Sequence, residues 1–549
     1  MKILLATLNS KYIHSNLAIR ILYEMNHEIP GLEWKEFTIK EDKNNIAGFC
    51  SQFDVIAFSC YIWNISHTLE VAKRIKEQNK NAKILLGGPE VSYDFDSVIS
   101  KKEVDYIIYG EGEIAFQKFL QQYGNWENIP SLAWKKDNQI IKNKVAEPFN
   151  ILLFSESMPY RFDEISSLQN KVLYIETSRG CPYKCEFCLA SLDNKVRYLP
   201  MESIKKTLLF MMENGRIIKF LDRTFNLKKD FTLEIFQFIL DHYKPGNVFQ
   251  FEITADILHP DIICFVNEKV PKNLFRFEIG IQSVKQEANK AVSRNQNFEK
   301  TKEIISLVKN KVELHLDLIV GLPHDYYSDI KKGIEDVFKL YAPEFQLGFL
   351  KFLKGTPLRE KFRQYEYVFD ENPPYQIIRS SFLSESELEK IVRAEDALEI
   401  YWNSGKAVYT LKYLAEKYSV YDFLESTGIY FFQNFAGKQY GIKEMYDTLI
   451  YSAKKSFPED KIVTEMISID FHLHHKVKPK SILSDEIDKQ TKNRLINELN
   501  LNHHKYRFAF LPITFKWKSF INENKIDKEN EWLIIQYDGI NKPQILNSL

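Results

Sequence analysis

The sequence predicts an α/β protein with an N-terminal doubly wound parallel sheet, a central partial (β/α)6 barrel and a mostly helical, mixed C-terminal domain. Two separate stretches alternate short apolar runs with amphipathic helical patterns, as parallel sheets covered by helices do. After residue 372 this alternation fades and helical patterns dominate. A chain of 549 residues also exceeds what one hydrophobic core usually fills, so several domains are expected.

The first alternation covers residues 1–130. Its apolar runs predict strands at 2–7, 55–60, 83–88 and 106–110, with helices at 16–25 and 68–78. Glycine-rich loops follow the last two strands, as Gly87-Gly88-Pro89 and Gly110-Glu111-Gly112-Glu113. In a doubly wound sheet the loops at the carboxyl ends of the strands form the ligand crevice. We therefore expect a ligand site beside these glycines.

Residues 131–168 are more polar and predict a connector with a small hairpin at 132–141. Six strand-helix units follow in residues 169–372. Strands are expected at 172–177, 217–222, 249–254, 274–283, 313–323 and 344–352. Helices are expected at 201–214, 231–242, 260–267, 298–309 and 328–341. This count predicts a partial barrel with its chemistry at the carboxyl ends of the strands.

Residues 373–549 predict a separate domain with helices at 385–402, 408–425 and 441–454. Two histidine pairs occur here, at 472–475 and at 503–504. No cysteine accompanies them and their spacing is not that of a ligand set, so we do not expect a metal site there.

The charge balance disfavours several classes of partner. Lys plus Arg equals Asp plus Glu at 74 each, so no overall field favours nucleic acid or a membrane surface. No window approaches the roughly 20 apolar residues that span a bilayer. We expect a soluble, cytoplasmic protein without nucleic-acid or membrane partners.

Three of the six cysteines, Cys181, Cys185 and Cys188, lie within eight positions after the strand at 172–177. Three thiolates can hold three irons of a four-iron four-sulfur cluster and leave the fourth iron open to a ligand. A structural zinc site would need a fourth Cys or His at comparable spacing, and this loop contains none. An odd number of cysteines also disfavours disulfides. Zinc and a chemically inert loop are the alternatives.

The segment T-S-R-G-C-P-Y-K-C-E-F-C resembles the cluster motif of the radical S-adenosylmethionine (SAM) superfamily. In that family SAM binds the open iron, and an electron from the cluster splits it into methionine and a 5'-deoxyadenosyl radical. F-E-I-G-I-Q-S and D-L-I-V-G-L-P resemble barrel segments of its cobalamin-type enzymes, methylthiotransferases and coproporphyrinogen oxidases. The resemblance implies contacts to SAM or substrate from Phe187, Asp222, Glu252, Glu278, Gln282, Ser283, Arg294 and Gly321.

Each of these residues also has a structural interpretation. A carboxylate at a strand end, such as Asp222 or Glu252, is often only a helix cap. Gln282 and Ser283 could cap the following helix, and Gly321 could belong to a simple turn. The order of these residues along the barrel supports the functional interpretation of the set.

A flavodoxin-like domain before such a barrel resembles the cobalamin-binding-domain radical SAM proteins of the class B type. This resemblance implies that cobalamin lies against Ser59, Tyr61, Trp63, Gly87, Gly88, Gly110, Glu111 and Gly112. The sequence lacks D-x-H-x-x-G, which predicts a lower corrin face without a histidine ligand. Tyr61 or Trp63 would pack there instead, with burial in the core as the alternative for Trp63. The C-terminal region resembles an uncharacterised extension of such proteins, with substrate selection as its expected role.

The expected activity is cobalamin-dependent methylation of an unreactive centre, with an electron donor such as flavodoxin or ferredoxin. The sequence does not identify the substrate. A radical rearrangement or cyclisation with the same cofactors is the nearest alternative. A non-catalytic cobalamin or redox sensor is another. A transfer-RNA methylthiotransferase is disfavoured, because its N-terminal domain would need three cluster cysteines and this one has only Cys50 and Cys60.

Overall fold

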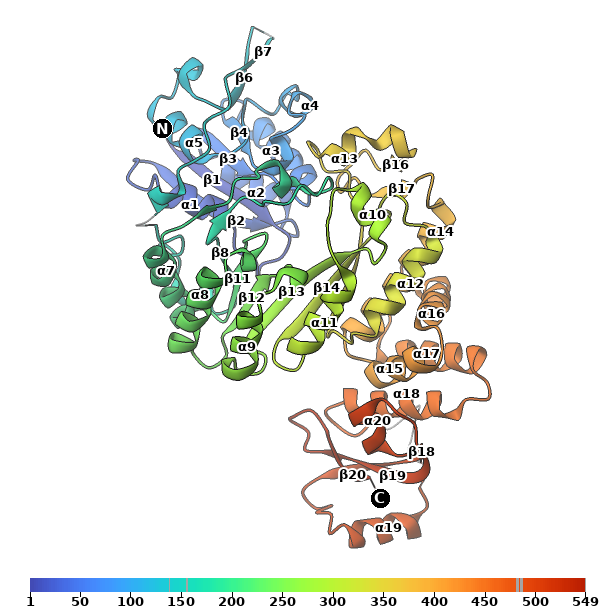
Figure 1. The fold of residues 1–549 in the computed structure, drawn as a ribbon. Helices are drawn as coiled ribbons and strands as arrows, with labels where there is room; N and C mark the ends of the chain where they lie inside the picture. The colour runs from blue at the N-terminus through green and yellow to red at the C-terminus, as the bar shows by residue number, and fades with distance from the viewer. Residues whose placement is uncertain (138, 155–156, 480–482, 484–486, 549) are drawn as a thin grey trace.

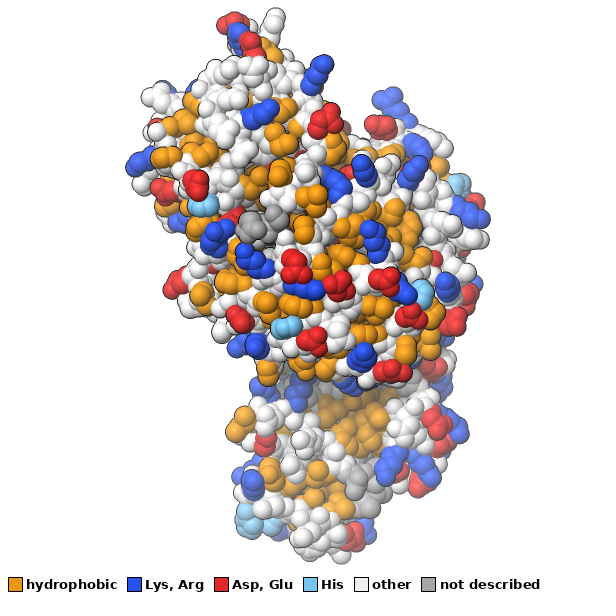
Figure 2. Space-filling view, turned by 60° about the vertical axis from the view of Figure 1, so that its left-hand side comes forward, with side chains coloured by type: hydrophobic (Ala, Val, Ile, Leu, Met, Phe, Trp, Pro, Cys, Tyr) orange, Lys and Arg blue, Asp and Glu red, His pale blue; other side chains and the backbone are white. Residues whose placement is uncertain are grey.

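The computed structural model describes residues 1–137, 139–154, 157–479, 483 and 487–548. Figure 1 shows the N-terminal domain at one end, the barrel in the middle and a small antiparallel sheet at the opposite end. Acidic and basic side chains are interspersed over the face shown in Figure 2, in keeping with the balanced composition. None of the helices in the described ranges is long and apolar enough to cross a membrane.

The N-terminal sheet has the strand order β2-β1-β3-β4-β5-β6-β7. Its first five strands are parallel, and β6 and β7 are added antiparallel at the edge. The order 2-1-3-4-5 is that of flavodoxin-like sheets, with the switch point between β1 and β3. The strands are β1 (Ile3–Asn9), β2 (Leu32–Thr38), β3 (Val55–Ser59), β4 (Lys83–Gly87), β5 (Tyr106–Ile108), β6 (Leu132–Lys136) and β7 (Gln139–Lys142). The helices are α1 (Leu17–Glu24), α2 (Lys43–Cys50), α3 (Ile65–Gln78), α4 (Asp96–Ile99) and α5 (Glu113–Gln121).

This domain differs from the expectation in two ways. The hairpin at 132–141 exists, but it extends the N-terminal sheet and is not part of a free connector. Strand β2 and helices α2, α4 and α5 have no counterpart among the predicted elements. In β2 only Leu32 and Phe37 are buried, so this edge strand lacks the continuous apolar run of the central strands.

The central sheet has six parallel strands in the order β8-β11-β12-β13-β14-β15, which confirms the predicted partial (β/α)6 barrel. Phenylalanine rings such as Phe220 and Phe251, whose centroids are 4.5 Å apart, fill its core. The strands are β8 (Val172–Ile175), β11 (Ile217–Phe220), β12 (Val248–Glu252), β13 (Phe275–Gln282), β14 (Glu313–Val320) and β15 (Glu344–Phe349). The main helices are α7 (Met201–Asn214), α8 (Lys229–His242), α9 (Pro260–Lys269), α10 (Gln286–Ala291), α11 (Phe298–Val308) and α12 (Tyr327–Phe338).

The C-terminal region has a helical layer and a terminal sheet. Helices α14 to α18 share one hydrophobic core with the barrel. The predicted helix at 408–425 is two helices, because Ser419 accepts a hydrogen bond from the Asp422 amide and starts a new one. The helices are α14 (Glu385–Leu398), α15 (Val408–Lys417), α16 (Val420–Phe435), α17 (Ile442–Ser456), α18 (Lys461–His474), α19 (Lys489–Glu498) and α20 (Trp517–Glu523). The antiparallel strands are β18 (Arg507–Phe515), β19 (Lys528–Tyr537) and β20 (Gln544–Ser548).

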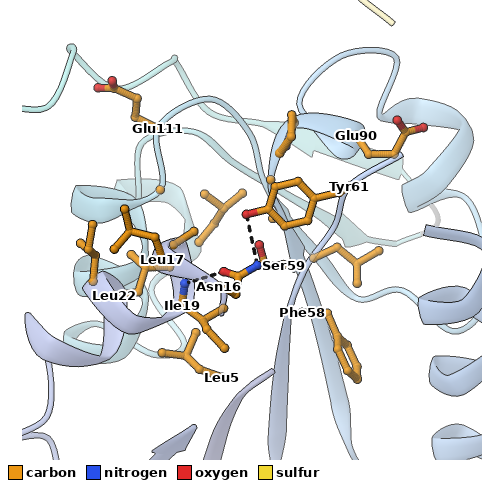
Figure 3. A pocket seen from close by; sticks show the side chains of 18 of the residues that line it. Leu5, Asn16, Leu17, Ile19, Leu22, Phe58, Ser59, Tyr61, Glu90 and Glu111 are labelled. Carbon is orange, nitrogen blue, oxygen red and sulfur yellow. Dashed lines mark hydrogen bonds between the residues drawn. The ribbon is translucent and has the colours of Figure 1, made fainter. Parts of the chain in front are cut away.

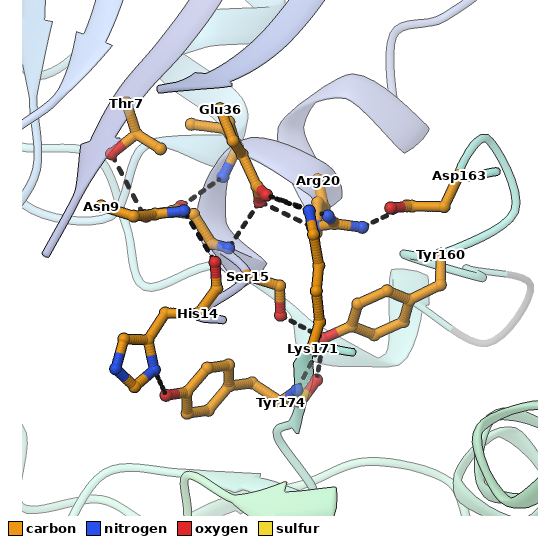
Figure 4. A network of polar contacts seen from close by, with 12 residues as sticks. Thr7, Asn9, His14, Ser15, Arg20, Glu36, Tyr160, Asp163, Lys171 and Tyr174 are labelled. Carbon is orange, nitrogen blue, oxygen red and sulfur yellow. Dashed lines mark hydrogen bonds and ion pairs between the residues drawn. The ribbon is translucent and has the colours of Figure 1, made fainter. Parts of the chain in front are cut away.

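A buried polar network joins the N-terminal domain to the first barrel strand (Figure 4). Arg20 on α1 is 1% exposed and contacts Glu36 at 2.9 Å and Asp163. Lys171, directly before β8, reaches the same Glu36 at 3.0 Å. The Val172 amide donates to the Ile13 carbonyl at 2.7 Å. These contacts fix the carboxyl ends of the N-terminal sheet over the barrel.

Candidate cofactor sites

The three cysteines of the predicted cluster loop line one cavity of about 350 Å³. Cys181 and Cys185 are buried, and Cys188 is half-buried. The loop is fixed at its start by the Cys181 amide, which donates to the Asp193 carbonyl at 2.8 Å. Gly180 has φ +97°, and an added Cβ would lie 2.6 Å from the Lys195 carbonyl oxygen. Three sulfurs that face one space fit a cubane cluster with an open iron.

Five of the residues predicted to contact SAM or substrate line the same cavity: Phe187, Glu252, Glu278, Gln282 and Arg294. Arg294 donates to the Gly280 carbonyl at 2.5 Å, and its Nη1 lies 3.8 Å from the Cys185 Sγ. Within the described ranges, the buried Oε1 of Gln282 has no hydrogen-bond partner. An unpaired buried acceptor in the cavity of the three cysteines fits a site built for a polar ligand.

Asp222 is not among the residues that line the cavity. It is buried at 1% exposure and accepts hydrogen bonds from the Thr177 amide at 3.1 Å, the Thr177 hydroxyl at 2.6 Å and the Ser178 hydroxyl. Burial disfavours the charged carboxylate and raises the pKa of Asp222 to about 6, although these donors oppose the shift. Asp222 therefore holds the chain just before the cysteine loop.

Ser283 and Gly321 also lie outside the cavity lining. The Ser283 hydroxyl accepts from the Lys285 amide at 3.0 Å, a local turn contact before helix α10, whose N-cap is Lys285. Gly321 has φ +98°, and an added Cβ would lie 2.7 Å from the Ile377 side chain. Its carbonyl accepts from the Tyr367 hydroxyl at 2.8 Å. Gly321 thus packs against the segment that follows the barrel.

A charged network lies on the barrel side of this cavity. Glu278 contacts Lys219 at 2.8 Å and His315 at 3.5 Å, and His315 contacts Asp317 at 3.0 Å. Burial disfavours the charged forms, but the ionic hydrogen bonds outweigh it. They lower the pKa of Glu278 to about 2 and raise the pKa of His315 to about 10. Sequence reasoning missed Lys219 and His315, since neither lies in a recognisable motif.

This network predicts a pH window for stability. Glu278 stabilises the folded state above its ordinary pKa of 4.5, and this contribution is lost as the pH falls toward about 2. His315 stabilises it below 6.5, and this contribution is lost as the pH rises toward about 10. We expect both contributions to be complete between pH 4.5 and 6.5. Wild type should lose part of its free energy of unfolding between pH 6.5 and 9, and His315→Gln should lose less. Urea denaturation at both pH values measures this, and identical losses in the two proteins would contradict it.

A second cavity, of about 700 Å³, lies at the carboxyl ends of the N-terminal strands and reaches the barrel. All eight residues predicted to face cobalamin line it: Ser59, Tyr61, Trp63, Gly87, Gly88, Gly110, Glu111 and Gly112. Figure 3 shows apolar Leu5, Leu17 and Leu22 on the side opposite Glu111 and Glu90. An apolar wall with a polar rim fits a large, amphipathic ring ligand.

Tyr61 and Trp63 form a stacked pair in this cavity, with ring centroids 4.4 Å apart and planes 6° apart. The Tyr61 hydroxyl accepts from the Asn16 side chain at 3.3 Å. Trp63 is 47% exposed, so its interpretation as a core residue is wrong. The pair presents a flat aromatic surface to whatever fills the cavity.

Gly88 provides a close approach that a side chain would prevent. Its φ is +104°, and an added Cβ would lie 2.6 Å from the Cys60 carbonyl oxygen. We expect Gly88→Ala to separate the loops after β3 and β4 and to reduce corrin retention, as measured by corrin absorbance after desalting. Gly124→Ala is the matched control, because Gly124 has φ +98° but open space around it. Each variant also places a non-glycine residue at positive φ, which costs about 1–3 kcal/mol. Equal corrin retention in both would contradict the role of Gly88.

The two cavities meet at the domain boundary. Arg223, directly after β11, lines both of them. Glu111, from the loop after β5, contacts Arg197 at 2.6 Å and Arg179 at 3.2 Å, and these arginines flank the cysteine loop. No sequence pattern had singled out Arg179, Arg197 or Arg223.

Comparison with known proteins identifies three parts of the chain. Residues 5–120 match the B12 binding domain, and residues 175–337 match the radical SAM superfamily. Residues 363–539 match a protein family of unknown function, DUF4080. The predicted resemblance to radical SAM proteins with a cobalamin-binding domain is confirmed.

One curated relative is the cobalamin-dependent radical SAM methyltransferase TokK from Streptomyces tokunonensis, 30% identical over 148 residues. The match covers 25% of this chain and 22% of that protein, so it spans less than a quarter of the relative's length. Among solved structures, the cobalamin-dependent SAM radical enzyme OxsB has a TM-score of 0.57 at 15% identity, covering 92% of this chain and 81% of OxsB. TsrM from Kitasatospora setae, a radical SAM methyltransferase, has a TM-score of 0.57 at 13% identity, covering 68% and 80%. At these identities the two structures show a shared fold.

Proposed function

Because the chain carries a B12-binding domain before a radical SAM domain, we propose that it is a cobalamin-dependent radical SAM methyltransferase. The observation that carries this proposal is the junction of the two cavities at Arg223. Methylation of an unreactive carbon requires hydrogen abstraction and methyl delivery at the same substrate atom. Two adjoining cavities, one lined by three cysteines, meet this requirement.

The residues present fit both groups. Cys181, Cys185 and Cys188 would hold the cluster, and Phe187, Glu252, Gln282 and Arg294 would face SAM or substrate. The eight loop residues of the second cavity would hold the corrin. When bound, cluster and SAM supply a hydrogen-abstracting radical and the corrin supplies a methyl group. The Arg294 guanidinium places positive charge beside the Cys185 sulfur and fixes the Gly280 backbone.

The methylthiotransferase alternative gains no support from the N-terminal domain. Cys50 and Cys60 are both 0% exposed and belong to the core of the first sheet. Burial raises the pKa of Cys50 to about 12. Both thiols are packed in this core, and neither is among the residues that line the two cavities.

The proposed reaction needs a reductant and a substrate. We propose a flavodoxin or ferredoxin as the electron donor, as in the family that the sequence resembles. All six cysteines are free, which suits a reducing compartment and supports a cytoplasmic location. The DUF4080 region, whose helices α14 to α18 share the barrel core, is the proposed substrate-selecting part.

Anaerobic reconstitution with iron, sulfide and hydroxocobalamin tests the proposal. We expect about four irons and a retained corrin per chain, with 5'-deoxyadenosine formed from SAM under reducing conditions. A retained corrin without 5'-deoxyadenosine would favour the sensor alternative. Loss of the corrin on desalting would contradict the proposed cobalamin-dependent methylation, but it would not affect the proposed radical SAM site.

A further inference from the structure

We propose that Arg223 binds an anionic group, a carboxylate or a phosphate, on the substrate that lies across the two cavities. This inference rests on the proposed function, which requires one substrate to reach both cofactors. It adds the chemical class of that substrate and a residue that selects it.

The position of Arg223 is the first support. Its side chain follows strand β11 at the carboxyl edge of the barrel sheet. Among the residues that line the two cavities, Arg223 is shared by both. Its side chain is 55% exposed although it stands at the domain junction. The guanidinium therefore opens onto the space that a bridging substrate would occupy.

The unused donors of Arg223 are the second support. A guanidinium has five N–H donors in a planar fork. Across the described ranges, the Arg223 side chain makes no hydrogen bond, and its ion partner Glu252 is 3.6 Å away. Burial raises the pKa of Glu252 despite the positive charge of Arg223. At 3.6 Å, Glu252 lies beyond hydrogen-bond distance and leaves most of the fork free.

The other cations that line the two cavities are either engaged or enclosed. Arg179 contacts Glu176 and Glu113 at 2.8 Å, and Arg294 donates to the Gly280 carbonyl. His315 lies 3.0 Å from Asp317. The Lys354 side chain, 3.7 Å from Glu90, is only 11% exposed. Of these cations, Arg223 combines a distant ion partner with an exposed side chain. A planar fork of this kind suits bidentate recognition of a carboxylate or phosphate.

Two sources could supply a carboxylate here: the substrate, or the methionine part of SAM. The test therefore uses holoprotein with the cluster oxidised and SAM bound. The probes are succinate and inorganic phosphate, with uncharged succinamide as the control, and ligand-observed NMR measures binding. Arg223→Met and Arg223→Lys are compared with Arg216→Met, because Arg216 is exposed at the opposite end of the same strand.

We expect both anions, but not succinamide, to bind wild type and Arg216→Met equally. Arg223→Met should weaken anion binding at least about tenfold, as loss of charge-assisted hydrogen bonds does, and Arg223→Lys should weaken it less. Equal binding of succinamide, or unchanged anion binding in Arg223→Met, would overturn the inference. A tenfold loss of SAM affinity with anion binding unchanged would assign Arg223 to the SAM carboxylate and also overturn it.

The same proteins separate this inference from the proposed function. If wild type forms 5'-deoxyadenosine but binds neither anion, only the inference about Arg223 is contradicted. If wild type binds anions through Arg223 but forms no 5'-deoxyadenosine, the proposed methyltransferase activity is contradicted, and the anion site at the junction is retained.

Discussion

Cys185→Ala is expected to abolish the iron-sulfur cluster and SAM cleavage together. Each of the three sulfurs would hold one iron, and the cavity offers no fourth cysteine among the residues described to replace the lost ligand. Cys185 is also the sulfur nearest Arg294, at 3.8 Å, so the change removes the thiolate that this guanidinium faces. Iron content, the absorbance of the reconstituted protein and 5'-deoxyadenosine formation measure the result.

Cys264→Ala is the matched control for this experiment. Cys264 is exposed on helix α9 and is not among the residues that line the two cavities. We expect it to keep iron and SAM cleavage at the wild-type level. Full iron content with SAM cleavage in Cys185→Ala would overturn the assignment of the cluster loop.

Arg20→Met is expected to lower the free energy of unfolding by about 3–5 kcal/mol, the usual cost of removing one partner from a buried ion pair. The Arg20 side chain lies between Glu36 and Asp163, which are themselves 8% and 4% exposed. Its guanidinium is also 4.8 Å from the ring centroids of Trp34 and Tyr160. Without it, Glu36 keeps Lys171, but Asp163 is left as a buried carboxylate without a cation.

Urea denaturation followed by tryptophan fluorescence measures this loss. Arg74→Met is the control, because Arg74 forms a partly exposed pair with Glu70 one helical turn away. Such surface pairs contribute about 0.3–0.5 kcal/mol. Similar losses in both variants would show that the junction network contributes no more than a surface contact. A large loss confined to Arg20→Met would identify this network as the main polar link between the two domains.

Much of the fold could be predicted because central parallel strands are buried on both faces and form continuous apolar runs. Helix α7 was predicted at its observed bounds, Met201–Asn214. The edge strand β2 was missed because only two of its seven residues are buried. The break between α15 and α16 was missed because Tyr418 and Ser419 do not disturb the helical pattern of apolar residues. Ser419 nevertheless caps and begins the second helix.

The cysteine loop and the glycine-rich loops could each be expected to line one cavity, because short motifs after strands place their side chains at one sheet edge. Individual barrel residues could not be placed in this way. Asp222 and Arg223 are neighbours at the end of one strand, yet Asp222 turns inward to Thr177 while Arg223 lines both cavities. Both residues lie beyond the end of β11 at Phe220, where no regular alternation sets the direction of a side chain.

The ion pairs of Glu111 couple the two cavities. This one carboxylate lines the larger cavity and also contacts Arg179 and Arg197, which flank the cysteine loop. A ligand that displaces the loop after β5 would therefore change the contacts of the cysteine loop as well. These side chains are partly exposed to solvent, so high salt should weaken this coupling by screening.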